Sequence, residues 1–80
     1  MTRQDILQAV RESKACDGKK IRVENWVIWT EKTLNLHHPG PAWWWLIYAH
    51  RDGAPHKIGG WNYATEATRI ILKENTKEAS

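Results

Sequence analysis

Residues 41–48 read PAWWWLIY, an apolar run in the middle of a chain of 80 residues. As a strand, this run would send Trp43 and Trp45 to one face of a sheet and Trp44 and Tyr48 to the other. Both faces would then be apolar, yet a chain of this length supplies one core and too little material for a second covering layer. The run therefore predicts a sheet with one face packed against helices and one aromatic face open to a partner.

Local signals predict the elements around this strand. Thr2 and Asp5 form a capping-box pattern, which predicts the start of a helix, and Thr65 is suited to cap a second one. The expected ranges are 2–15 and 65–74 for the helices, 20–30, 43–50 and 57–63 for the strands, and 75–80 for a frayed tail. The predicted fold class is α+β in the order α-β-β-β-α: a single domain over residues 1–80, with two helices on one face of a three-stranded antiparallel sheet.

Three interruptions divide this order. Gly18 offers a stop for the first helix, and alternation within the first strand slips near Asn25, which indicates a bulge or a break. Residues 31–41 end in His-His-Pro-Gly-Pro, which predicts a loop. Gly53 lies in a run with turn chemistry, so the second and third strands are expected to form a hairpin.

The helices carry narrow apolar stripes, which suffice for one face of the sheet. We assign to them the face with Trp45, Ile47 and Ala49, because it is smaller and more aliphatic than the other. The opposite face would show an aromatic patch, continued across the second hairpin by the third strand. This candidate protein-binding surface consists of Trp44, Leu46, Tyr48, Trp61 and Tyr63.

The 6 tryptophans have three interpretations: core filling, which accounts for some of them, a protein-binding or self-association surface, and a platform for nucleic-acid bases. Aromatic side chains are favoured at the centres of protein interfaces. We therefore expect a small non-enzymatic binding protein whose partner is another protein or a second copy of the chain. A phage or mobile-element accessory protein, or an inhibitor of host machinery, would have this character.

Nucleic-acid binding is the alternative. The net charge of +3 is concentrated between Arg11 and Arg22, and a basic cluster of this kind suits an acidic partner. Combined with aromatic stacking, it would give binding that tolerates many base sequences. The candidate residues are Arg11, Lys14, Lys19, Lys20, Arg22, Arg51 and Lys57.

Metal binding and catalysis find little support in the sequence. Four histidines are present, but His37 and His38 precede the second strand while His50 and His56 flank its far end, so one four-histidine site is excluded. Asp52 near His50 is the sole acid–histidine pair in view, and no phosphate loop or nucleophile motif appears. We expect no cofactor, no metal, no catalytic residue and no small-molecule substrate.

The expected compartment is the cytoplasm. Cys16 is the single cysteine, so no internal disulfide forms, as is usual in a reducing compartment. No apolar run approaches the ~18 residues that cross a bilayer, and the amino-terminal residues lack a signal-peptide core. We expect no membrane partner.

The order of elements resembles that of the double-stranded-RNA-binding domain. Gly40-Pro41 before the second strand, Gly53 in the hairpin and Gly59-Gly60 in the third strand carry this resemblance. In that family, lysines at the start of the last helix contact phosphates, whereas residues 64–68 here contain none, so the resemblance implies the fold and not the usual RNA contact. The GGWNYATEA stretch is also similar to the sheet-plus-helix of integrase amino-terminal DNA-binding domains.

Overall fold

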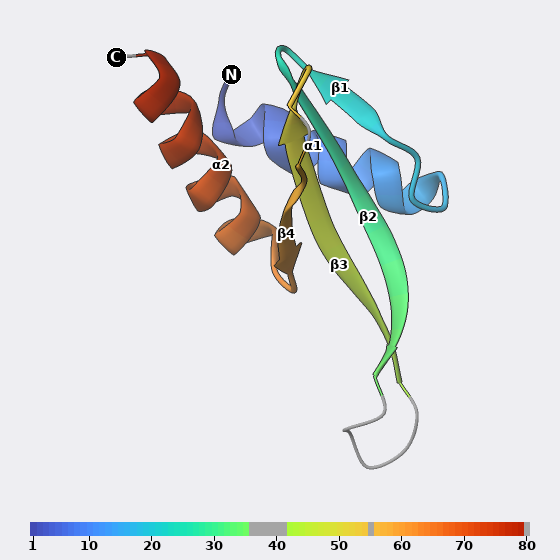
Figure 1. The fold of residues 1–80 in the computed structure, drawn as a ribbon. Helices are drawn as coiled ribbons and strands as arrows, with labels where there is room; N and C mark the ends of the chain where they lie inside the picture. The colour runs from blue at the N-terminus through green and yellow to red at the C-terminus, as the bar shows by residue number, and fades with distance from the viewer. Residues whose placement is uncertain (36–41, 55, 80) are drawn as a thin grey trace.

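A computed structural model of the chain describes residues 1–35, 42–54 and 56–79. It shows an α+β fold in which two helices accompany a four-stranded antiparallel sheet of order β1-β2-β3-β4 (Figure 1). In chain order, the elements are α1 (Arg3–Ala15), β1 (Ile21–Val23), β2 (Trp26–Asn35), β3 (Ala42–Arg51), β4 (Ile58–Trp61) and α2 (Ala64–Ala79). The predicted fold class is confirmed at this level, with one strand more than expected.

The additional strand arises where the alternation slips. The expected strand over residues 20–30 is divided by a tight turn at Glu24 and Asn25, after which Trp26 pairs with Val23. Glu24 has φ of +53°, a left-handed conformation that an unbroken strand does not contain. The prediction of a single strand was therefore wrong, although the position of the break was correctly placed.

Strand β2 also runs further than expected, through residues that the sequence predicted to be a loop. Lys32, Thr33 and Leu34 pair in register with Trp45, Trp44 and Trp43 of β3. Cross-strand contacts with indoles offset the weak strand preference of this polar segment. The resulting hairpin projects past the ends of both helices and past β4 (Figure 1). The rest of the predicted loop, residues 36–41, lies outside the described residues.

Helix α1 begins as predicted. Thr2 is its N-cap, and Thr2 and Asp5 exchange the two hydrogen bonds of a capping box. The helix ends at Ala15, where Asp17 with φ of +56° and Gly18 with φ of +88° turn the chain. A side chain at Gly18 would place its Cβ 2.6 Å from the carbonyl oxygen of Thr30, so glycine is required there by a close approach to β2.

Helix α2 is longer than predicted at both ends. It begins at Ala64 with Thr65 inside the first turn, and the backbone carbonyl of Tyr63 accepts from Ala67 N–H at 3.1 Å. At its other end, the helix continues through the segment expected to fray. Two side chains of the sheet hold it: Trp26 Nε1 donates to Asn75 Oδ1 at 3.3 Å, and Arg51 donates to the carbonyl of Glu74 at 2.6 Å.

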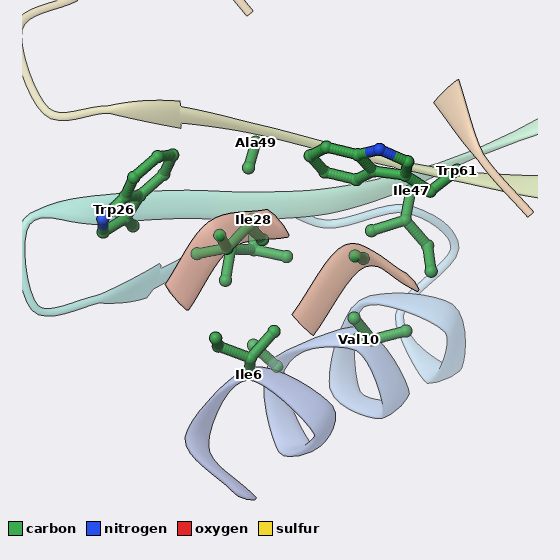
Figure 2. Packing of buried hydrophobic residues seen from close by; sticks show 10 residues of the cluster. Ile6, Val10, Trp26, Ile28, Ile47, Ala49 and Trp61 are labelled. Carbon is green, nitrogen blue, oxygen red and sulfur yellow. The ribbon is translucent and has the colours of Figure 1, made fainter. Parts of the chain in front are cut away.

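The core lies between the helices and one face of the sheet (Figure 2). It contains Ile6, Ala9 and Val10 of α1, Trp26, Ile28, Ile47, Ala49 and Trp61 of the sheet, and Ala67 and Ile71 of α2. Ile47 and Ala49 therefore face the helices, as the sequence predicted. Among the helices that the structure describes, none is long and apolar enough to cross a membrane.

A β-bulge in β4 sets the direction of Trp61. Tyr48 pairs with Gly59 while Ile47 pairs with Trp61, so Gly60 is an extra residue in the ladder. In a regular ladder without this bulge, Trp61 would lie opposite Leu46 on the open face, where the sequence placed it. With it, Trp61 is 9% exposed in the core beside Ile47 (Figure 2).

Candidate functional site

The projecting end of the β2–β3 hairpin carries exposed apolar side chains that the helices leave uncovered. We call residues 31–34 and 42–45 the distal ribbon. On its helix side, the cross-strand neighbours Leu34 and Trp43 are 41% and 62% exposed. Lys32 from the same side places its Nζ 5.5 Å from the Trp43 ring centroid, a cation–π contact that leaves most of the indole in solvent.

This exposure reverses an expectation. The sequence placed Trp43 and Trp45 on the face where they can be core residues, and Trp44 on the face that the chain has no obvious means of covering. Instead Trp44 and Trp45 are both partly buried, and Trp43 is the exposed member of the triplet. The face on which each tryptophan lies was predicted correctly, but the helices end before they reach Trp43. Burial therefore depends on the position along the strand as well as on the face of the sheet.

Beside the ribbon, a surface hollow of about 320 Å³ lies at the ends of the helices. It is lined by Lys14, Trp44, Trp45, Asn62 and Tyr63. Tyr63 is 69% exposed and directly precedes α2, so it lies at the helix end and not among the aromatic residues of the open sheet face. The structure thus places Trp61 in the core, away from the predicted protein-binding surface, whereas Tyr63 shares this hollow with Trp44.

The open face of the sheet carries a second aromatic group. Trp29 stacks on Tyr48 with ring centroids 5.9 Å apart, and it makes an edge-to-face contact with His50 at a centroid distance of 5.6 Å. Trp29 is 7% exposed although no helix covers it. Trp29 is not among the site residues predicted from the sequence, yet alternation from Ile28, which faces the core, would have placed it on this face.

Lysine side chains cover these rings. Lys20 Nζ lies 5.0 Å from the Trp29 ring and Lys57 Nζ lies 4.3 Å from the Tyr48 ring. Glu31 links the Trp29 indole to the Lys57 ammonium group, because its Oε2 accepts from Trp29 Nε1 at 2.9 Å and from Lys57 Nζ at 3.4 Å. The Trp29 hydrogen bond, followed by the charges of Lys57 and Lys20, lowers the pKa of Glu31 below its ordinary value.

The basic residues expected to form one cluster are distributed over both sides of the sheet. Arg22 pairs with Asp52 at 2.6 Å on the same side as Lys20 and Lys57. On the helix side, Arg51 has its guanidinium 4.7 Å from the Trp26 ring. The other candidates, Arg11, Lys14 and Lys19, are exposed on or just after α1. Only part of the predicted basic surface therefore adjoins the aromatic rings.

A hollow of about 520 Å³ on the open face contains His50 and His56 with the Lys20, Glu31 and Lys57 group. In the part of the chain that the structure describes, no three side chains of the metal-ligating types converge, and His37 and His38 fall outside that part. The acid–histidine pair does not form either. His50 Nδ1 lies 2.7 Å from the carbonyl oxygen of Arg51, while Asp52 is paired with Arg22.

Comparisons of this chain with protein-family models, with curated proteins and with solved structures found no match. The resemblance to the double-stranded-RNA-binding domain therefore stays a prediction. What the fold defines is a small α+β domain with a projecting aromatic hairpin, and its function has to be inferred from that geometry.

Proposed function

We propose that this chain is a non-enzymatic protein-binding domain and that the distal ribbon is its binding surface. The observation that carries the proposal is the cross-strand pair of Leu34 and Trp43, exposed on a ribbon beyond the helices. A two-stranded ribbon is marginally stable in water by itself. Indoles on both of its faces reduce its solubility unless a partner covers them.

The composition of the ribbon favours a protein partner. Trp43, Trp44 and Trp45 are large side chains of few rotamers, which lose little entropy when an interface forms. Two charged residues, Glu31 and Lys32, lie on β2, and they have opposite signs. The ribbon thus offers apolar area with no net charge, which suits an apolar protein groove or strand better than a phosphate backbone.

Site-specific photo-cross-linking tests the proposal. A benzophenone side chain introduced at Trp43 should give a discrete protein adduct in expressing cells, whereas the same group at Ile58 should not. Ile58 is a matched control because it is also exposed, at 37%, but lies on β4 opposite Ala49, away from the ribbon. Equal labelling from both positions, no adduct, or an adduct with nucleic acid would overturn the proposal.

Nucleic-acid binding is the second candidate, and it would use the opposite side of the sheet. The favouring observation is the pair of lysines held over Trp29 and Tyr48 on the open face. Binding there should weaken steeply as salt rises and should be lost when Lys20 and Lys57 are changed to glutamate. Changing Trp43 should leave it intact, so the two candidates are separable.

A further inference from the structure

The outer edge of β3 is the open side of the distal ribbon. Strand β4 pairs with β3 at residues 47–49, and no described strand pairs with residues 42–46 on that edge, although Asn62 and Tyr63, which follow β4, line a hollow with Trp44 and Trp45. Unpaired strand edges bind further strands readily unless charges, prolines or covering elements block them. The two edges of the ribbon differ greatly in this respect.

The edge of β2 is protected. Ser13 Oγ accepts from the backbone N–H of Thr30 at 2.9 Å, and Gly18 packs closely against the carbonyl oxygen of the same residue. Beyond Thr30, the strand continues with Glu31 and Lys32, whose charges oppose pairing with another strand. The edge of β3 reads Ala-Trp-Trp-Trp-Leu from residue 42 to 46 and has no charge or proline.

The Ser13 contact also fixes which backbone groups of β3 point outward. Thr30 N–H is directed away from β3, so Thr30 and Ile47 form a pair that is not hydrogen-bonded within the hairpin. Alternation then directs the backbone groups of Trp45 and Trp43 toward the outer edge as well. Two residues with outward N–H and C=O groups therefore flank Trp44 symmetrically.

We propose that two copies of this chain pair through these edges, antiparallel and with the two-fold axis at Trp44; the inference rests on the proposed function of the ribbon. In this register, Trp43 of one copy faces Trp45 of the other, and both such pairs exchange two backbone hydrogen bonds. Ala42 faces Leu46, and the two Trp44 residues face each other. No charged side chain meets another anywhere along the joint.

The position of β4 and the two outward residues favour this register. A pairing centred on Trp45 would place Trp43 opposite Ile47, whose edge is already occupied by β4. A pairing centred on Trp44 uses both outward residues and stops before β4. It also makes one continuous sheet with the helices of both copies on the same side, where the exposed indole of each Trp43 packs against Trp45 of the second copy.

A disulfide experiment tests this geometry. In a Cys16→Ser background, Trp44→Cys should form a covalent dimer on mild oxidation, because Cα atoms of such an antiparallel pair lie ~4.5 Å apart, within disulfide reach. Thr33→Cys is the matched control, since it lies on the same face but on the next strand of each copy, ~14 Å from its counterpart. Preferential cross-linking from position 33, or from Trp43→Cys, would overturn the register.

The solution mass gives a second readout without cysteine. Light scattering should show a dimer, and Trp43→Lys should raise its dissociation constant on the order of 100-fold, because each dimer loses two indole contacts. Ile58→Lys should leave the mass unchanged. A monomeric native chain overturns the inference, and the photo-cross-link from Trp43 then separates the cases: an adduct with a different protein preserves the proposed function, and no adduct removes both.

Discussion

Trp29 and Glu31 show how a single hydrogen bond links an indole to the charge of the open face. The bond from Trp29 Nε1 is the largest cause of the lowered pKa of Glu31. Since the folded pKa lies below the unfolded value of ~4.3, Glu31 stabilises the fold fully above that value. The contribution is lost as the pH falls through the lowered folded pKa.

Trp29→Phe should therefore raise the pKa of Glu31 toward its ordinary value, because phenylalanine keeps the ring but lacks the N–H. The pKa is measured from the pH dependence of the Glu31 carboxyl resonance by NMR. Asp5 is the internal control, since its pKa is lowered by hydrogen bonds at Thr2, far from this substitution. An unchanged Glu31 pKa in the variant would show that the lysines, and not the indole, set it.

Gly59 and Gly60 differ in what a side chain would meet. A Cβ at Gly59 would lie 2.5 Å from the carbonyl oxygen of Ile47, and its φ is +131°, whereas a Cβ at Gly60 meets nothing nearer than 4.0 Å at φ of +89°. Gly59→Ala should cost ~3 kcal/mol or more and Gly60→Ala ~1–2 kcal/mol. Urea unfolding measures both, and equal losses would mean that the bulge relaxes around either side chain.

The sequence predicted the alternation of β3 correctly but not the burial of its individual tryptophans. The face to which a side chain points follows from the two-residue repeat of a strand, which is a local property of the sequence. Whether Trp43 is covered depends on where the helices end in space, and whether Trp61 is covered depends on one extra residue at Gly60. The two adjacent glycines of β4 were a sequence signal for a bulge, but a prediction from alternation alone ignores that signal.

Among the elements, α1 and β2 are joined by a small polar contact inside the core. Ser13 Oγ lies 3.1 Å from Thr30 Oγ1 and also accepts from the Thr30 backbone N–H. Ser13→Ala should cost ~1–3 kcal/mol, because it leaves that N–H buried without an acceptor. Thr30→Val is the milder control, since it keeps the backbone bond. Thermal unfolding measures the loss of stability in both variants. A larger loss for Thr30→Val than for Ser13→Ala would contradict this expectation.

Helix starts and strand ends were not equally predictable. The capping box at Thr2 is encoded by two side chains within one turn, so sequence alone locates it. The end of β2 depends on pairing with β3, and the end of α2 depends on Trp26 and Arg51 from the sheet. Contacts between distant segments override local preference in both places.

At the scale of the whole molecule, the fold has a packed body and a projecting ribbon. Every residue of the core cluster belongs to the helices or to the part of the sheet nearest to them. The ribbon contributes none, and its exposed large apolar residues are Leu34 and Trp43. The body is therefore expected to hold its structure without the ribbon, and the ribbon is expected to serve binding.

Shortening the hairpin tests this division. In the shortened chain, Asn-Gly replaces residues 34–43. Thr33 and Trp44, which are paired across the hairpin, are then joined by a two-residue turn that suits antiparallel strands. Because Ile28, Ile47 and the rest of the core are untouched, the unfolding midpoint should change by only ~5 °C or less. Dimerisation should disappear, because both Trp43–Trp45 pairs of the proposed joint are lost with Trp43. If the shortened chain instead loses its cooperative unfolding transition, the ribbon is part of the folding unit and its indoles stabilise the body rather than a partner.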